Sequence, residues 1–146
     1  MSVSRIVVDT NVFAAGFTSS VGSNREVIRR CLAGRVHPLM SSALFHEYES
    51  VLTRASVLAR CPLKQDERDQ LLDAFLQACD WIRISFLWRP NLADESDNHV
   101  MELAVAGGAT AVVTNNVRDF RGGDLVFPDI RVLTPARFLK SLEKTR

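Results

Sequence analysis

The chain has 146 residues, of which 47% are hydrophobic and 24% are charged. This composition is that of an ordinary globular protein and excludes a mainly disordered chain, and the length predicts one domain over residues 1–146. Eighteen basic and seventeen acidic residues give a net charge of +1, so any surface that binds a polyanion has to be local.

Short apolar segments alternate with helical patterns along the chain. In chain order, the pattern predicts a strand at 5–8, a helix at 24–34, a strand at 36–40, helices at 42–54 and 66–79, a strand at 81–86, a helix at 97–106, strands at 111–114 and 130–133, and a helix from 134 to 144. Strands that alternate with helices form parallel sheets with helices on their faces. We therefore expect an α/β fold, a three-layer α/β/α sandwich with a five-stranded parallel sheet.

The connecting segments are polar or rich in small residues. Residues 9–11 have the composition of a turn, and 16–23 is rich in glycine and serine. Residues 88–96 form a polar connector, and 115–129 form a polar loop with a short turn near 119–120.

The sequence also bears on where the protein works. No apolar run approaches the roughly 20 residues of a membrane span, and the first residues lack the pattern of a signal peptide. The cysteines Cys31, Cys61 and Cys79 are spaced too widely for a disulfide framework or a zinc site. We expect no membrane association and a reduced, cytoplasmic location.

Polar residues follow two of the predicted strands. Asp9 comes directly after the first strand, and Asn116 and Asp119 follow the strand at 111–114. In parallel α/β sheets, ligands bind beyond the carboxyl ends of the strands. These side chains are therefore expected at one edge of the sheet.

Two further acids fall on apolar faces of predicted helices. Glu47 flanks the stripe that contains Leu44 and Tyr48, and Asp97 lies one turn before Met101 on the buried face of its helix. Burying an isolated carboxylate costs several kcal/mol or forces its protonation, so each acid needs a partner.

Each acid also has an ordinary interpretation. Asp94 and Asp97 suit the first turn of a helix, Asp9 suits a turn, and Glu47 suits a solvated or salt-bridged helix edge. As a set, Asp9, Glu47 and Asp97 have no adjacent basic residue in the sequence. Crowded carboxylates need a cation, and a cluster of oxygen ligands suits Mg²⁺ or Mn²⁺ better than zinc.

Four segments resemble the signature of the PIN-domain family. They are, in order, IVVDTNVF (6–13), SSALFHEYESVL (41–52), DESDNHVMELA (94–104) and AVVTNNVRDF (111–120). The similarity is greatest to the VapC-type toxins of bacterial toxin–antitoxin systems, which LTPARFL (133–139) also resembles.

The resemblance implies a metal-dependent endoribonuclease that uses Mg²⁺ or Mn²⁺ to cleave RNA. By position, Asp9, Glu47 and Asp97 match the first three acids of the family, and Asp94 matches an additional acid, so these four are the expected catalytic residues. The family also implies an RNA substrate, a cognate antitoxin protein as partner, and a possible homodimer.

One position departs from the family pattern. Where the family has Thr-x-Asp, this chain has Thr114-Asn115-Asn116, so a neutral amide replaces a carboxylate and a second metal ion is in doubt. Asp119 is expected either to compensate as a ligand or to cap the following turn. The expected metal ligands are thus Asp9, Glu47, Asp97, Asn116 and Asp119.

RNA contacts are expected beside the acids. Asn11 and Thr10 match the polar residues that follow the first acid of the family, and Arg118 and Arg121 flank the loop after the fourth strand. The full expected set is Thr10, Asn11, Thr114, Arg118 and Arg121, with Arg25, Arg29 and Arg30 as weaker candidates. Trp88 suits base stacking, a core position or a dimer interface.

Other functions are less consistent with the sequence. A haloacid-dehalogenase-type phosphatase would need an acid where Asn11 stands, and His37, His46 and His99 are interpreted as structural or surface residues. The alternative to a nuclease is a non-catalytic PIN-like module that binds RNA or protein and whose metal site has degenerated, as Asn116 would suggest.

Overall fold

A five-stranded parallel sheet forms the centre of the molecule. The computed structural model describes residues 4–19, 21–84, 95–120 and 129–144, with the backbone alone at 95–97 and 144. Within these ranges the strands pair in the order β3-β2-β1-β4-β5, and every pairing is parallel. The strands are β1 (Arg5–Val8), β2 (His37–Met40), β3 (Asp80–Trp81), β4 (Ala111–Val113) and β5 (Arg131–Leu133). The predicted α/β fold is therefore confirmed.

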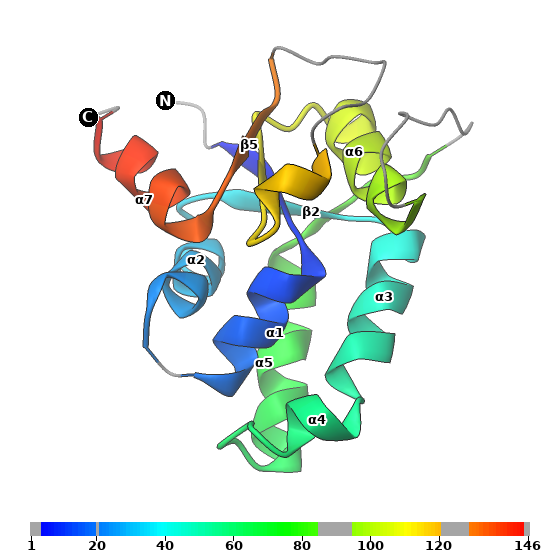
Figure 1. Ribbon diagram of the computed structural model, residues 1–146, viewed down its shortest axis with the longest axis vertical. Helices are drawn as coiled ribbons and strands as arrows, with labels where there is room; N and C mark the ends of the chain where they lie inside the picture. Colours follow the sequence, from blue (N-terminus) through cyan, green and yellow to red (C-terminus); the bar gives the residue numbers. More distant parts are fainter. Residues whose placement is uncertain (1–3, 20, 85–94, 121–128, 145–146) are drawn as a thin grey trace.

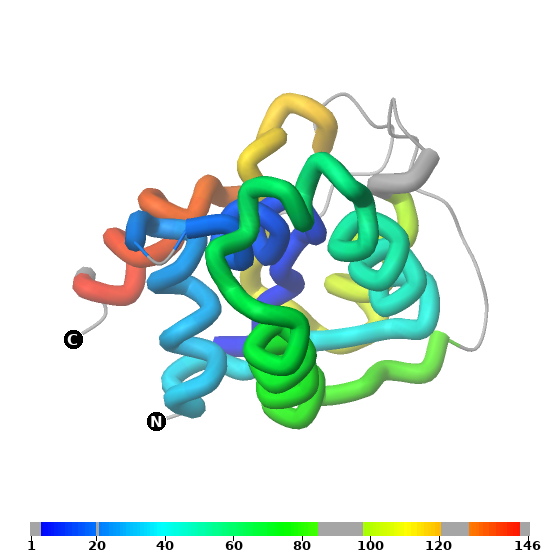
Figure 2. Tube along the Cα trace, turned by 90° about the horizontal axis from the view of Figure 1, so that it is seen from below, coloured from blue at the N-terminus to red at the C-terminus, as the bar shows by residue number. Residues whose placement is uncertain are grey.

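Helices cover both faces of this sheet (Figure 1). The helices are α1 (Thr10–Thr18), α2 (Ser23–Leu32), α3 (Ser42–Leu52), α4 (Ala55–Leu58), α5 (Gln65–Ala78), α6 (Glu95–Gly107) and α7 (Pro135–Lys144), with a 3-10 helix η1 (Val117–Phe120) after β4. Helix α6 packs against β1, β2 and β4, and seen from below it lies on the side of the molecule away from α2 (Figure 2). This is the expected α/β/α arrangement.

The central strand β1 is buried on both faces. Ile6 pairs with Pro38 of β2 and with Ala111 of β4, and Val8 pairs with Val113. Ile6 and Val8 are at most 1% exposed. A continuous apolar run suits a strand covered by helices on both sides, and it places the residue after the strand at the middle of the carboxyl edge of the sheet.

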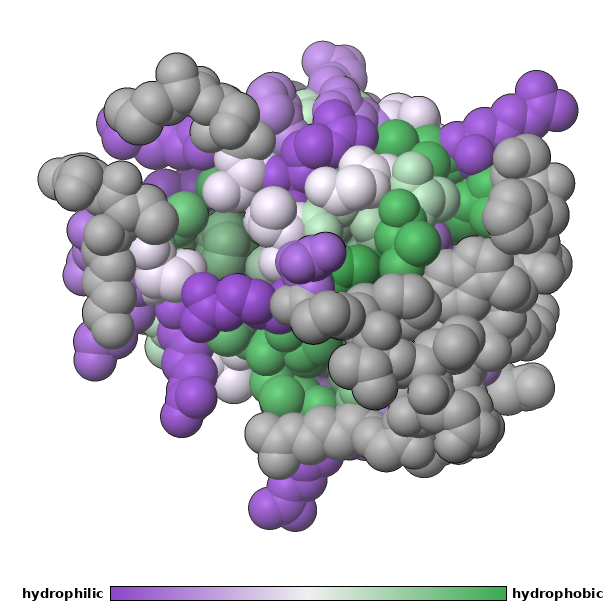
Figure 3. Space-filling view, turned by 90° about the horizontal axis from the view of Figure 1, so that it is seen from above, coloured by the Kyte–Doolittle hydropathy of each residue, from purple (hydrophilic) through white to green (hydrophobic). Residues whose placement is uncertain are grey.

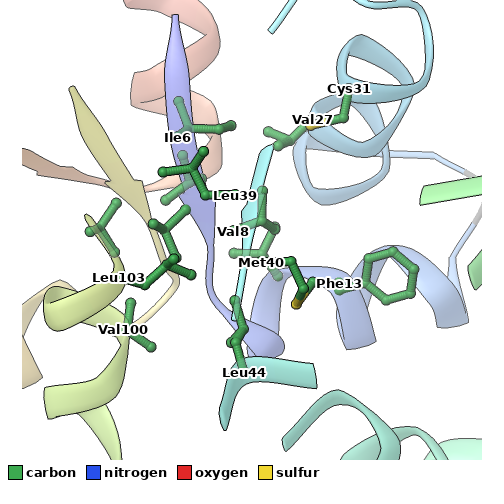
Figure 4. Close-up of a cluster of buried hydrophobic side chains, with 14 of the residues drawn as sticks. Ile6, Val8, Phe13, Val27, Cys31, Leu39, Met40, Leu44, Val100 and Leu103 are labelled. Carbon is green, nitrogen blue, oxygen red and sulfur yellow. The ribbon is translucent and has the colours of Figure 1, made fainter. Parts of the chain in front are cut away.

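The hydrophobic core fixes the elements that carry the predicted acids. Val100 of α6 and Val27 of α2 approach the sheet from different sides (Figure 4). Phe13, Tyr48 and Phe75 form an aromatic cluster, with ring centroids 5.1 Å apart for Phe13–Tyr48 and 4.8 Å for Phe13–Phe75. Since aromatic pairs at such distances attract beyond their buried area, the cluster joins α1, α3 and α5.

The structure differs from the prediction mainly at residues 9–18. The turn expected at 9–11 is the start of α1, because the Asp9 side chain accepts a hydrogen bond from the backbone N–H of Thr10 and caps the helix. Gly16 lies inside α1, where a Cβ would approach the Ile28 Cδ1 to 2.5 Å, so its lack of a side chain allows α2 to pack closely. The short helix α4 was also not predicted.

The remaining predicted elements are found with small shifts at their ends. The strand predicted at 81–86 is shorter, since β3 is Asp80–Trp81 and residues 82–84 are not in a strand. Residues 85–86 and most of the predicted connector, including Trp88, lie outside the described residues.

In the described part of the chain, no helix combines the length and the apolar character that crossing a bilayer requires. Seen from above, hydrophobic residues gather near the middle of that face, and hydrophilic residues occupy much of its rim (Figure 3).

Candidate functional site

Asp9 lies where β1 ends and α1 begins, and its carboxylate is fixed by three donors. Its Oδ1 accepts from the backbone N–H of Thr10 at 2.8 Å, and its Oδ2 accepts from the Thr114 hydroxyl at 2.8 Å and from the Asn11 amide at 3.2 Å. The residue is only 4% exposed. The carboxylate is thus buried, fully oriented and located at the carboxyl edge of the sheet.

Thr114 connects the ends of β4 and β1. It is 0% exposed, and its hydroxyl donates to Asp9 while accepting from the Asn116 backbone N–H at 3.0 Å and from the Asn11 amide at 3.2 Å. The Asn11 side-chain oxygen in turn accepts from the backbone N–H of Asn115 at 3.0 Å. Because a hydroxyl has one proton and two lone pairs, this Thr114 hydroxyl is fully used.

Glu47 reaches the same region from α3. Its Oε1 accepts from the Thr10 hydroxyl at 2.5 Å, and its Oε2 lies 2.9 Å from the His99 Nε2 of α6. The next residue, Tyr48, is fully buried and donates from its hydroxyl to the Val8 carbonyl at 2.6 Å. Tyr48 therefore holds α3 against the end of β1, directly before Asp9.

The electrostatics of the site favour a cation. Burial raises the pKa of Asp9 above its usual range, and the negative charge of Glu47 raises it further. The hydrogen bonds from Thr114 and Thr10 and the nearby His99 act in the opposite direction on the same pKa. Among the described residues, Asp9 forms no ion pair with lysine or arginine. Two carboxylate groups in this setting suit a hard divalent cation, which prefers oxygen ligands.

The structure describes only part of the predicted acidic set. Asp97 lies in the first turn of α6, but its side chain is outside the description, and so are Asp94 and Arg121 entirely. Among the side chains that are described, no three histidine, cysteine, aspartate or glutamate residues form a group suited to a metal ion. The structure thus brings Asp9 and Glu47 together, and the role of Asp97 stays a prediction.

Asn116, Arg118 and Asp119 lie beside this network rather than inside it. All three are exposed, on the loop after β4 and on η1. Together with Thr134 and Arg137 they line a hollow of about 580 Å³, which we call the β4–β5 hollow. Among the contacts of the described residues, Asn116 is connected to Asp9 through its backbone N–H and the Thr114 hydroxyl. A metal-binding role for Asn116 or Asp119 therefore stays a prediction.

Two residues that were predicted to contact RNA, Thr10 and Thr114, are buried. Thr10 is 3% exposed and Thr114 is 0% exposed, and their hydroxyls donate to Glu47 and Asp9. Buried hydroxyls in these bonds hold carboxylates in place, and contact of these two residues with RNA stays a prediction. Asn11 is partly exposed and Arg118 is exposed, so both remain accessible for the predicted contact.

The sequence interpretation missed polar residues of α6. His99, predicted to be structural or a surface residue, contacts Glu47, which lies 52 positions away in the chain. Asn98 and Glu102 are each 3% exposed, and their Oδ1 and Oε1 atoms have no hydrogen-bond partner among the described residues. An acid between Met101 and Leu103 in an apolar stretch is a signal that could have indicated Glu102, whereas no sequence pattern indicates the pairing of His99.

Comparison with known proteins places this architecture in a family. The fold is similar to a chain in the crystal structure of VapBC2 from Rickettsia felis bound to a DNA fragment from their promoter, with a TM-score of 0.56 and 17% identity over 88% of this chain and 96% of that one. No curated protein matches the sequence. A family model of the PIN domain matches residues 5–118. This match covers most of the chain, including β1, α3, α6 and β4, and the chain therefore belongs to the PIN-domain family.

Proposed function

We propose that this protein is a divalent-metal-dependent endoribonuclease and the toxin of a toxin–antitoxin pair. The observation that carries the proposal is the buried carboxylate of Asp9 beside Glu47 at the carboxyl edge of a PIN-domain sheet. Two acids lie close together there, and burial raises the pKa of Asp9. Such an arrangement costs folding free energy, and carboxylates with perturbed pKa values are typical of catalytic sites.

Asp9, Glu47 and Asp97 would hold one Mg²⁺ or Mn²⁺ ion, with Asn116 and Asp119 as further candidate ligands. The ion, when bound, supplies Lewis acidity that lowers the pKa of water and neutralises charge on a phosphate. The hydroxyls of the two buried threonines orient the carboxylates of Asp9 and Glu47, so that these need no rearrangement on binding.

The other catalytic roles follow from the same proposal. Asp94 or Asp97 would orient or deprotonate the attacking water as a general base. Asn11, Arg118 and Arg121 would contact the RNA, and the Arg118 guanidinium is suited to phosphate because it presents several donors in a planar fork.

The toxin assignment rests on the family and on fold similarity. The similar chain belongs to a VapBC2 complex, which supports a cognate antitoxin as the partner of this protein as well. We further propose that residues 1–146 act as one domain and that the protein works in the reduced cytoplasm, where Cys31, Cys61 and Cys79 stay free thiols, as the structure has them.

Cleavage of single-stranded RNA by the pure protein tests the proposal. We expect cleavage with Mn²⁺ or Mg²⁺, none with EDTA, and losses of at least about 100-fold for Asp9→Asn and Asp97→Asn, since a metal ion supplies several kcal/mol of transition-state stabilisation. The matched control is Asp80→Asn, which also removes one carboxylate but lies in the outer strand β3 and pairs with Arg5. Full activity in both site variants, or activity that EDTA leaves unchanged, would reject the assignment.

A second candidate is a PIN-like module that binds RNA or protein without cleaving it. Asn116 favours it, because an amide replaces an acid after β4 and weakens the attraction for a second cation. The same assay separates the two candidates, since this module would bind RNA and leave it intact at every metal concentration.

A further inference from the structure

The β4–β5 hollow carries a second set of chemically useful groups next to the acids. Its polar wall comes from three elements that are separate in the sequence, namely the loop after β4, η1 and the start of α7. Its volume of about 580 Å³ is in the range typical of sites for small organic molecules and cofactors.

Two arginines give the hollow its positive charge. Arg118 comes from η1 and Arg137 from the first turn of α7, and both are exposed. Neither forms an ion pair with any residue that the structure describes. Asp119 also lines the hollow, so the side chains leave a net charge of 2 − 1 = +1 there. Unpaired guanidinium groups around a cavity suit a phosphate, which they can bind with two parallel hydrogen bonds.

The apolar and amide side chains that line the hollow suit the base of a nucleotide. Val117 and Val132 offer an apolar surface. The Asn115 amide donates one N–H to the Asn24 side chain at 2.9 Å, which leaves its second N–H and its oxygen for a ligand. The Thr134 hydroxyl accepts from the backbone N–H of Arg137 at 3.3 Å, which fixes the start of α7 against the hollow. An apolar wall with amides nearby can accept a base and hydrogen-bond to its edge.

A short chain of hydrogen bonds connects the hollow to the acids. The Asn116 backbone N–H donates to the Thr114 hydroxyl, and this hydroxyl donates to Asp9. The Asn115 backbone N–H donates to the Asn11 side chain, which also contacts Asp9. The hollow therefore begins beside the proposed reaction site, two hydrogen bonds from the Asp9 carboxylate.

We propose that the β4–β5 hollow binds one nucleotide of the RNA substrate next to the scissile phosphate, with Arg118 and Arg137 on a backbone phosphate. This inference rests on the proposed ribonuclease function and adds Arg137 and the base-binding wall to it. The subsite holds the strand in register while Asp9 and Glu47 act on the adjacent phosphate.

Equilibrium binding without cleavage tests the subsite first. Asp9→Asn protein in EDTA, with a fluorescent single-stranded RNA of about ten nucleotides as the probe, cannot report turnover. We expect Arg137→Ala in this background to raise the dissociation constant about tenfold and to reduce the slope of log K against log salt by about 0.7, the change for one lost contact to a single strand. Arg137→Lys keeps the charge, so it should retain the salt slope and lose only part of the affinity.

The matched control is Arg35→Ala, which removes one exposed arginine just before β2, at the amino edge of the sheet. We expect its dissociation constant to stay within about twofold of the parent and its salt slope to be unchanged. An equal loss of affinity in both alanine variants would mean a diffuse charge effect and would overturn the subsite. The thermal midpoint of each variant shows that the fold is retained.

Cleavage kinetics then separate the subsite from the proposed function. On a long RNA with Mn²⁺, Arg137→Ala should raise KM about tenfold and leave kcat within about threefold, since it removes binding alone. If the wild type cleaves RNA and Arg137→Ala binds and cleaves it equally well, the subsite is wrong and the nuclease stands. If no protein cleaves RNA but the Arg137→Ala binding loss is found, the nuclease is wrong and the nucleotide-binding hollow stands. An Arg137→Ala effect confined to a protein partner would overturn the subsite.

Discussion

The two ends of β1 differ in the charged groups that surround them. At the amino end, the Arg5 guanidinium lies 3.0 Å from Asp80, and its Nε donates to the Gly107 carbonyl at 2.8 Å. The side chains of this ion pair are 38% and 47% exposed. At the carboxyl end, Asp9 is 4% exposed, and among neighbouring charges the one with the largest effect on its pKa is another carboxylate, that of Glu47.

The amino end of β1 therefore carries a structural ion pair, whereas the carboxyl end carries the candidate site. An exposed pair of opposite charges contributes only about 0–1 kcal/mol and needs nothing else. Two acids placed together, one of them buried, destabilise the fold until a cation or a proton arrives. At the carboxyl end of β1, binding of a cation would therefore both stabilise the fold and complete the candidate site. The predictions below test this contrast between the two ends.

The largest expected effect is stabilisation by metal. We expect Mn²⁺ at a hundredfold excess over its dissociation constant to stabilise the wild type by about 2.7 kcal/mol, a rise of about 5–10 °C in the thermal midpoint. Asp9→Asn should lose most of this rise, and Asp80→Asn should keep it. An unchanged midpoint of the wild type at millimolar Mn²⁺ would favour the module without a metal site.

The next effect concerns His99, which holds the Glu47 carboxylate by a bond of 2.9 Å. We expect His99→Ala to weaken metal binding about tenfold, because residues that orient a metal ligand typically contribute 10–100-fold. His99→Gln retains a donor and should recover part of the loss. Metal titrations followed by thermal shift measure both variants, and wild-type affinity in His99→Ala would show that Glu47 needs no such support.

Sequence patterns predicted the sheet and most helices because burial on both faces leaves a clear local signal. Strands such as Arg5–Val8 are short apolar runs, and the acids next to them can be placed at an edge by topology alone. The helix after Asp9 was missed because aspartate followed by threonine and asparagine suits both a turn and a helix start.

Contacts between distant segments left no local signal. His99 reaches Glu47 across 52 positions, and Arg137 and Arg118 line the same hollow because α7 packs beside β5. The burial of Thr10 and Thr114 was not predicted, since periodicity does not show that their hydroxyls point to acids. Sequence reasoning thus placed Asp9 at the carboxyl edge of the sheet and missed how its side chain and that of Glu47 are held.

A smaller effect is expected on stability in the absence of metal. Asp9→Asn keeps a good helix cap and removes a buried charge, so in EDTA at pH 7 we expect a gain of the order of 1 kcal/mol. Because the folded pKa of Asp9 is raised, its contribution to wild-type stability is present below about pH 4 and is lost as the pH rises through the folded pKa.

Urea unfolding of both proteins between pH 3 and 8 measures this difference. The advantage of Asp9→Asn should be near zero at the acid end, grow as Asp9 ionises, and then stay constant. A variant that is less stable than the wild type at pH 7 in EDTA would contradict the idea that the charge at this end of β1 opposes folding.

The smallest effect is expected at the amino end of β1. Asp80→Asn should lower the free energy of unfolding by no more than about 1 kcal/mol, because the carboxylate is half exposed and solvent screens its attraction to Arg5. The loss should shrink further in 1 M salt, where the screening length falls to about 3 Å. RNA cleavage should stay within about twofold of the wild type, because no described contact joins this pair to Asp9 or Glu47. A loss well above 1 kcal/mol that salt does not reduce would mean that Asp80 supports the sheet through its shape and hydrogen bonding, and the two ends of β1 would then differ less than their charges suggest.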